Sequence, residues 1–135
     1  MKQYKILWID DDVNGAELES EYDALKERGC SITAITNPDD LNIELISSVD
    51  CTIIDLSMPV GGKIKLQDAR SGSRTGFVLL QQIREKYPNA KIMIYSVFDV
   101  PDVRGYCTEH NVEYCTKSSI LADDFAEKIV ELMEN

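Results

Sequence analysis

The sequence lacks the features that mark membrane and exported proteins. No apolar run approaches the roughly 18 residues that a transmembrane helix requires. The N-terminus leads into only four apolar residues, Ile6 to Ile9, which is too short for the apolar core of a signal peptide. We therefore expect no membrane span and no export signal.

Histidine is scarce, and the spacing of the cysteines argues against a zinc site. His110 is the single histidine, and the four cysteines form no C-x-x-C pair. Without an export signal, we interpret the cysteines as reduced thiols of a cytoplasmic protein. We expect Cys51 and Cys115 to behave as small apolar residues inside strands.

Positive charge is also in short supply. The 14 Lys and Arg residues face 24 Asp and Glu residues, which gives a net charge of −10. Such a surface repels the phosphate backbone of nucleic acid, so no direct nucleic-acid partner is expected. The 135 residues, 44% of them hydrophobic, are enough for one domain with its own core, and we expect a single domain over residues 1–135.

Short apolar runs alternate with amphipathic segments along the chain. The pattern predicts five strands, at 6–9, 31–36, 51–56, 92–95 and 112–116. The strands at 6–9 and 51–56 are expected to be buried, and 31–36 alternates. Apolar residues at helical spacing predict five helices, one ending at Gly29, one starting at 37–38 with Leu41, Leu45 and Ile46 on one face, and three at 76–87, 102–110 and 121–133. Strands joined by helices indicate an α/β protein with a doubly wound parallel sheet and helices on both faces.

Chemically active side chains follow four of the five predicted strands. The first strand is followed by Asp10 to Asp12, the third by Asp55, the fourth by Ser96 and the fifth by Lys117. In a doubly wound sheet, ligands bind beyond the carboxyl ends of the strands, where these side chains would meet. Each of them alone is commonly a solvated turn, a helix cap or a surface charge. Their joint occurrence at strand ends is much more specific.

This set of side chains suits phosphoryl transfer. Neighbouring carboxylates repel one another, and a hard divalent cation such as Mg²⁺ relieves that repulsion and keeps coordination positions for a phosphate. The Lys117 ammonium would neutralise one phosphoryl oxygen, and Ser96 would donate a hydrogen bond to another. One carboxylate must accept the phosphoryl group as an acyl phosphate. Asp55 is the best candidate because it ends the central buried strand.

Four short motifs lie at the ends of these strands, in order. They are residues 6–12 (ILWIDDD), residues 53–59 (IIDLSMP), Tyr95-Ser96, and residues 114–117 (YCTK). Each resembles the corresponding motif of the receiver domains of response regulators in two-component signalling, here in a stand-alone, CheY-like form. The resemblance spans nearly the whole chain. It implies a flavodoxin-like, five-stranded parallel sheet in the order 2-1-3-4-5.

The resemblance implies a metal site and a phosphoacceptor. Asp11, Asp55 and the backbone carbonyl of Ser57 would bind Mg²⁺ or Mn²⁺, with Asp10 beside them and bonding through water. Asp55 would accept the phosphoryl group from a histidine kinase or a histidine phosphotransfer protein. Lys117 would hold its oxygens together with the hydroxyl that ends the fourth strand.

The resemblance also implies a switch. On phosphorylation, Ser96 would move toward the phosphate and Tyr114 would rotate inward behind it. This would change the face formed by the fourth helix (102–110), the fifth strand (112–116) and the fifth helix (121–133), where a downstream protein partner would bind. No DNA-binding segment follows the last helix in this sequence, so we expect output by protein–protein contact or by phosphate shuttling. The domain would be a signalling domain with at most slow autodephosphorylation, not an enzyme.

The sequence departs from the receiver pattern in four places. Pro59 and Gly76 lie 17 positions apart, which predicts a loop insertion at about 60–75 that is rich in Lys and Arg. Such a loop would fold over the site, dock a partner or remain solvated. Val97 replaces a very small residue and predicts slow turnover, because it restricts access to the phosphate. Ser118 replaces the proline that follows the lysine, which puts a cis peptide bond there in doubt, and Ser96 stands where threonine is commoner.

Two alternatives to a phosphorylated receiver remain open. A pseudo-receiver would be an interaction module that switches without phosphate; Val97, Ser118 and the insertion favour it, whereas the intact acidic residues and Lys117 oppose it. A metal-dependent phosphohydrolase would use the same aspartyl chemistry. Such enzymes usually carry a second acid two residues after the nucleophile, where this sequence has Ser57, so this alternative ranks last.

Overall fold

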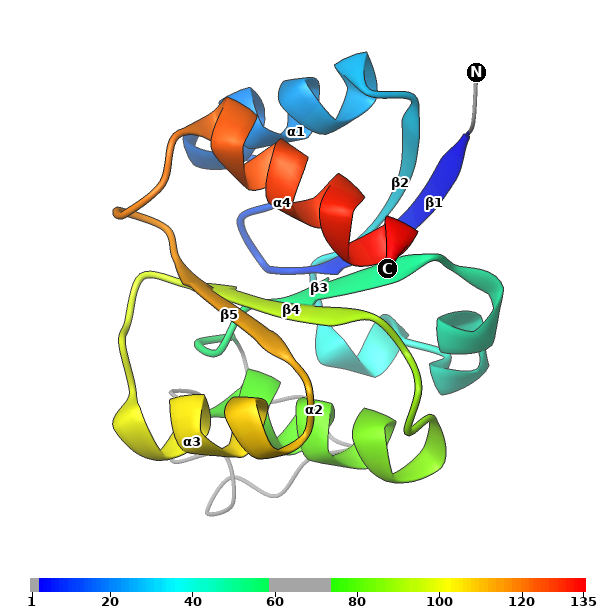
Figure 1. The fold of residues 1–135 in the computed structure, drawn as a ribbon, viewed down its shortest axis with the longest axis vertical. Helices are drawn as coiled ribbons and strands as arrows, with labels where there is room; N and C mark the ends of the chain where they lie inside the picture. The colour runs from blue at the N-terminus through cyan, green and yellow to red at the C-terminus, as the bar shows by residue number, and fades with distance from the viewer. Residues whose placement is uncertain (1–2, 59–73) are drawn as a thin grey trace.

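Five parallel strands form one sheet in the order β2-β1-β3-β4-β5 (Figure 1). The computed structural model describes residues 3–58 and 74–135. The expected loop insertion at about 60–75 lies outside the described residues, except for Arg74 and Thr75. The strand order confirms the prediction of a doubly wound, flavodoxin-like sheet. The strands are β1 (Tyr4–Ile9), β2 (Cys30–Ile35), β3 (Cys51–Ile54), β4 (Ile92–Ser96) and β5 (Glu113–Thr116).

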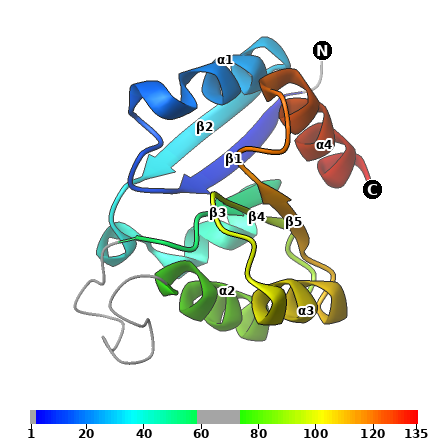
Figure 2. The same cartoon turned by 90° about the vertical axis from the view of Figure 1, so that its left-hand side faces the viewer.

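Helices form a layer on each face of the sheet (Figure 2). One layer consists of α1 (Glu19–Glu27) and α4 (Ala122–Glu134), and the other of α2 (Thr75–Lys86) and α3 (Pro101–Glu109). Because side chains alternate along a strand, those on the two faces of the sheet pack into two separate hydrophobic cores. The core beneath α1 and α4 contains Trp8, Tyr95 and Phe125, whereas Leu7 and Ile54 belong to the core beneath α2 and α3.

The helix predicted to start at residues 37–38 does not form as an α-helix. Two 3₁₀ helices take its place, η2 (Pro38–Asp40) and η3 (Ile43–Ser48). Asn42 lies between them in an extended conformation, and its side chain accepts a hydrogen bond from the Glu44 N–H. An asparagine that binds the backbone in this way competes with α-helical hydrogen bonds, which is why the helix breaks there. The fourth and fifth helices expected from the sequence are consequently α3 and α4.

The N-terminus of α2 is fastened to the loop that follows β3. Thr75 Oγ1 donates a hydrogen bond to the Met58 carbonyl (2.8 Å), and the Gly76 N–H donates to the Leu56 carbonyl (2.9 Å). A Cβ atom on Gly76 would lie 1.8 Å from the backbone carbonyl oxygen of Asp55. Only glycine allows so close an approach, so these contacts hold the loop that carries Asp55 directly against α2.

The four cysteines are buried free thiols. Cys51 and Cys115 lie inside β3 and β5, as expected, and burial raises the pKa of the Cys51 thiol to about 12.

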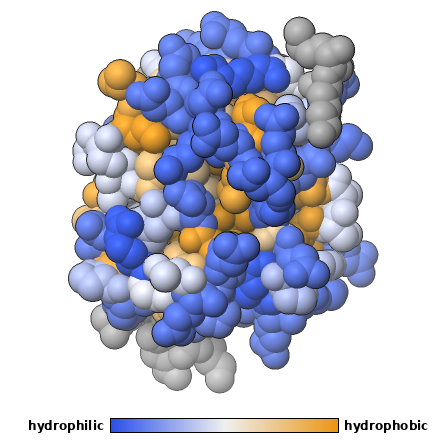
Figure 3. Space-filling view, in the orientation of Figure 1, coloured by the Kyte–Doolittle hydropathy of each residue, from blue (hydrophilic) through white to orange (hydrophobic). Residues whose placement is uncertain are grey.

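No helix in the described part of the chain is long and apolar enough to span a bilayer. On the face seen in Figure 3, hydrophilic residues cover most of α1 at the top of the molecule.

Candidate functional site

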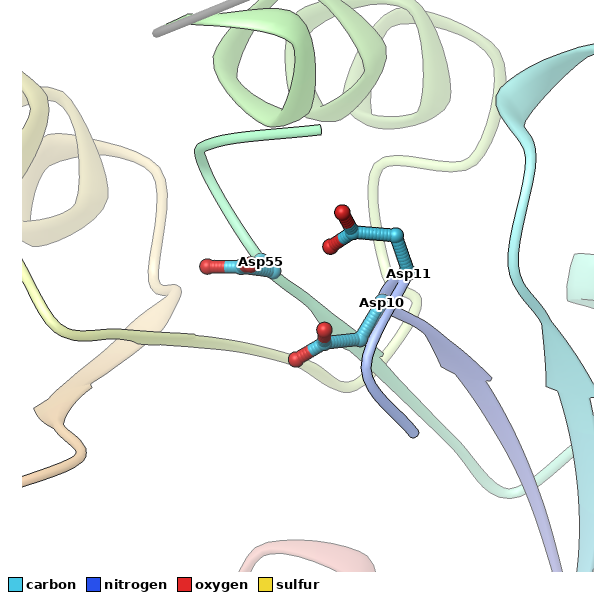
Figure 4. A group of neighbouring side chains, drawn as sticks. All are labelled: Asp10, Asp11 and Asp55. Atoms are coloured by element: carbon cyan, nitrogen blue, oxygen red, sulfur yellow. The ribbon is translucent and has the colours of Figure 1, made fainter. Parts of the chain in front are cut away.

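Three aspartates meet at the carboxyl edge of the sheet (Figure 4). Asp10 and Asp11 follow β1, and Asp55 follows β3, which pairs with β1. One carboxylate oxygen from each residue lies within 4.8 Å of the other two. Asp10 and Asp55 are 0% and 5% exposed, and Asp11 is exposed. The fold therefore brings together the acidic residues that the sequence singled out, because the two strands are neighbours.

Lys117 joins this group from the end of β5. Its Nζ donates a hydrogen bond to Asp10 Oδ2 at 2.8 Å and lies 3.6 Å from Asp55 Oδ2. Its backbone N–H donates to the Ser96 carbonyl at 2.8 Å. The ammonium thus lies between two buried carboxylates, one of which is the expected phosphoacceptor.

The carboxyl group of Asp55 is difficult to ionise. Burial and, next, the negative charge of Asp10 raise its pKa to about 7, although Lys117 acts in the opposite direction. Within residues 3–58 and 74–135, Asp55 Oδ1 is buried and has no hydrogen-bond partner. A buried carboxylate oxygen without a donor, beside two further carboxylates, fits a divalent cation that prefers oxygen ligands.

The neighbouring charges respond to the same environment. Burial and the charges of Asp12 and Asp10 raise the pKa of Asp11. Burial lowers the pKa of Lys117, but the hydrogen bond to Asp10 and the charges of Asp10 and Asp55 outweigh it and raise the pKa overall. Lys117 therefore keeps its positive charge, and within the described residues it is the one ammonium that contacts this group of carboxyl side chains.

A cavity of about 330 Å³ opens at this group. Asp11, Asp55 and Lys117 line it together with Ser57, whose backbone carbonyl is the remaining expected metal ligand. The cavity is large enough for a phosphoryl group with its metal and water ligands. Every residue expected to bind the metal is thus at or beside one cavity.

Two glutamates that were not predicted from the sequence, Glu17 and Glu21, also line this cavity. They flank the buried Leu18 with a spacing of four residues, which puts two side chains on one side of a helix. That spacing was the available signal. Two exposed apolar residues, Val97 and Phe98, also line the cavity and are 58% and 52% exposed. The cavity is therefore strongly acidic with an apolar part.

The two expected switch residues both bind the loop that joins β4 to α3. Ser96 is 0% exposed, and its Oγ accepts a hydrogen bond from the Phe98 N–H at 3.2 Å. Tyr114 is buried; its hydroxyl donates to the Phe98 carbonyl at 2.6 Å and accepts from the Val100 N–H at 3.2 Å. This loop leads directly into α3, so the end of β4 and the start of α3 are linked through Tyr114.

The described residues contain no cis peptide bond, so the bond between Lys117 and Ser118 is trans. A turn follows instead, in which the Ser119 N–H and Oγ donate to the Thr116 carbonyl at 3.2 and 2.9 Å. The doubt that Ser118 raised about a cis bond is therefore resolved against it. Lys117 reaches the carboxylates without one.

No protein-family model matches the sequence, and no curated protein matches it. Solved structures resemble it closely in shape. A CheY-like response regulator receiver domain protein from Methanospirillum hungatei JF-1 has a TM-score of 0.73 at 18% identity, covering 98% of this chain and 95% of that one. The receiver domain of the Francisella response regulator 1452 has a TM-score of 0.72 at 21% identity, with 98% of both chains covered.

A third structure is the isolated receiver domain of RcsB from Salmonella enterica serovar Typhimurium, in the presence of phosphomimetic BeF₃⁻. Its TM-score is 0.73 at 16% identity, covering 99% of this chain and 91% of that one. These likenesses extend over nearly the whole chain and agree with the observed strand order. The chain therefore has a doubly wound α/β fold. More narrowly, it has the fold of CheY-like response regulator receiver domains.

Proposed function

We propose that this chain is a two-component response regulator receiver domain that accepts a phosphoryl group on Asp55. The observation that carries the proposal is the meeting of Asp10, Asp11 and Asp55 within 4.8 Å at the sheet edge, with the Lys117 ammonium 3.6 Å from Asp55. Carboxylates for a metal, a lysine and a buried acceptor are the parts that aspartyl phosphorylation requires. The phosphoryl donor would be a histidine kinase or a histidine phosphotransfer protein.

Mg²⁺ or Mn²⁺ would be held by Asp11, Asp55 and the backbone carbonyl of Ser57, with Asp10 at the same site and bonding to the cation through water. The orphaned Oδ1 of Asp55 and the mutual repulsion of the three carboxylates support this assignment. When bound, the cation supplies positive charge that neutralises the transferring phosphoryl group. It also favours the ionised form of Asp55, which is the nucleophilic form.

In the proposed reaction, a carboxylate oxygen of Asp55 attacks the phosphorus atom of a phosphohistidine. The new O–P bond forms as the P–N bond breaks, and the leaving imidazole takes up a proton from solvent. Lys117 moves its hydrogen bond from Asp10 toward a phosphoryl oxygen, and the Ser96 hydroxyl donates to another. Water later cleaves the acyl phosphate, slowly, so the domain is a signalling device with no other enzymatic activity. Val97 at the cavity supports the slow step by limiting the approach of water.

The output would be a protein partner at the face of α3, β5 and α4. The coupling we propose runs from the phosphate through Ser96 and Tyr114, both of which bind the loop before α3. Two of the structural neighbours, the receiver domains of RcsB and DrrB, were solved with BeF₃⁻, a phosphate mimic, and their shared fold supports this mechanism here. We place the chain in the cytoplasm, where such donors act.

The proposal is tested by incubating the protein with acetyl phosphate, with and without Mg²⁺, and measuring its intact mass. We expect a gain of one phosphoryl group that requires Mg²⁺ and disappears in Asp55→Asn. Asp23→Asn, which changes an exposed aspartate of α1, serves as the matched control and should still gain the phosphoryl group.

A pseudo-receiver is the second candidate, favoured by the exposed Val97 side chain in the cavity. If the wild-type protein gains no mass under conditions that label an ordinary receiver domain, phosphorylation is refuted and the pseudo-receiver stands. A mass gain that persists in Asp55→Asn would place the acceptor elsewhere.

A further inference from the structure

Lys117 reaches Asp10 across two intervening strands and Asp55 across one. It follows β5, whereas Asp10 follows β1, and β3 and β4 lie between them in the sheet. With neighbouring strands about 4.8 Å apart, the two strand ends are separated by three spacings, roughly 14 Å. A lysine side chain with four rotatable bonds has many other conformations available. Contacts along the Lys117 side chain therefore select the conformation that is observed.

Tyr95 lies on that path. It pairs with Cys115 across β4 and β5, and Lys117 follows Cys115 by two residues, in the turn after β5. The centroid of the Tyr95 ring is 6.0 Å from Lys117 Nζ. The ring itself is 1% exposed and is packed against Phe125 (4.3 Å between centroids) and Trp8 (6.4 Å). It cannot move without disturbing the core.

Glu21 fixes the polar end of the same ring. The Tyr95 hydroxyl donates a hydrogen bond to Glu21 Oε2 at 3.2 Å. Glu21 belongs to α1 and lines the cavity that also contains Lys117 and Asp55. Tyr95 is therefore held at both ends, by the aromatic core and by α1, and presents a fixed π face beside the ammonium.

We propose that Tyr95 is a positioning residue for Lys117, and that its ring keeps the ammonium between Asp10 and Asp55. The inference rests on the proposed function, because it concerns how Lys117 meets the phosphoryl group. Without the ring, the lysine side chain gains room on the α1 side and spends less time beside Asp55. Phosphoryl uptake then slows, while the carboxylates that bind the metal stay in place.

The test compares Tyr95→Leu, Tyr95→Phe, Lys117→Ala and the double variant Tyr95→Leu/Lys117→Ala. The rate of uptake from acetyl phosphate is followed by intact mass, and the Mg²⁺ dissociation constant is measured by calorimetry. Tyr95→Leu should slow uptake by about 10-fold, since a misplacement of about 1 Å can cost up to 10²-fold. Tyr95→Phe keeps the ring and should restore most of the rate. Mg²⁺ binding should not weaken in either single variant at position 95.

The double variant separates positioning from general damage. If Tyr95 acts through Lys117, Tyr95→Leu has no further effect once Lys117 is alanine, because the two effects are not additive. Met93→Ala is the matched control: Met93 is buried on the same face of β4, two residues further from the site, and should leave the rate unchanged. If Tyr95→Leu fails to fold, as judged by circular dichroism, Tyr95→Met replaces it as a flexible apolar filler.

Two results would overturn the inference. One is an unchanged rate in folded Tyr95→Leu or Tyr95→Met, and the other is an equal loss in the wild-type and Lys117→Ala backgrounds. Both require a wild-type protein that takes up phosphate. A wild-type protein that takes up none contradicts the proposed function itself, so the two failures are distinguishable.

Discussion

Replacing Asp55 by asparagine should stabilise the metal-free protein at alkaline pH and have little effect at acidic pH. The carboxyl group has a pKa of about 7 in the folded protein, against an ordinary value of about 3.9 in an unfolded chain. The folded state therefore binds the proton more tightly. The stability contributed by this group is complete below the unfolded value and is lost as the pH rises through about 7.

The size of the effect follows from that difference. As the pH rises from about 5 to the folded pKa of about 7, the free energy of unfolding of the wild type falls by roughly 1.4 kcal/mol per pH unit, or about 3 kcal/mol in all. Between about pH 7 and pH 8 it changes little more. Asparagine carries no charge at either pH and loses nothing from this site. The difference in free energy of unfolding between Asp55→Asn and the wild type should thus grow by about 3 kcal/mol over this range.

Urea titrations in the presence of a chelator measure this difference. Trp8 is the only tryptophan and is 0% exposed, so its fluorescence reports unfolding of the core. Asp23→Asn, on the exposed side of α1, controls for the loss of one negative charge from a chain of net charge −10. If the wild type and Asp55→Asn change in parallel from pH 5 to pH 8, burial does not suppress the ionisation of Asp55 and the argument is wrong.

Two further predictions concern the same site. Mg²⁺ at about 100 times the wild-type dissociation constant should raise the free energy of unfolding of the wild type by about 3 kcal/mol in urea titrations. An equal gain in Asp11→Asn at the same Mg²⁺ concentration would place the metal elsewhere. Gly76→Ala should destabilise the protein by about 3 kcal/mol or more, because its Cβ would lie 1.8 Å from the Asp55 carbonyl oxygen. A near-normal melting temperature for Gly76→Ala would show that α2 can move away from the loop after β3 at little cost.

Strands β1, β3 and β4 could be predicted from the sequence because each is a short apolar run that is buried almost throughout. The edge strand β2 is mostly half-buried or exposed, and its alternating residues were the signal. The cluster of Asp10, Asp11, Asp55 and Lys117 could be predicted for a related reason. All parallel strands end at one edge, so residues that follow them converge whatever their distance along the chain. The strand ends were therefore enough to find these four residues, whereas the strand order came from the resemblance to receiver domains.

Other features depend on contacts that no short pattern contains. A single α-helix does not follow β2 because the Asn42 side chain binds the backbone at the start of η3, whereas the apolar spacing of Leu41, Leu45 and Ile46 fits an α-helix equally well. The hydrogen bond from Tyr95 to Glu21 joins residues 74 positions apart. Their encounter depends on how α1 lies on the sheet, and neither residue is distinctive by itself.

The hydrogen bond between Met58 and Thr75 joins residues 17 positions apart. The segment between these two residues is therefore a suitable position for inserting or exchanging a peptide. Met58 and Thr75 are in direct contact, so the two ends of the intervening segment are fixed at one place on the fold. Doubling the length of a closed loop costs only about 0.6 kcal/mol of entropy. Evolution could therefore exchange a binding epitope here without altering the acidic cluster. A protein engineer could splice in a reporter peptide at the same position on the same grounds.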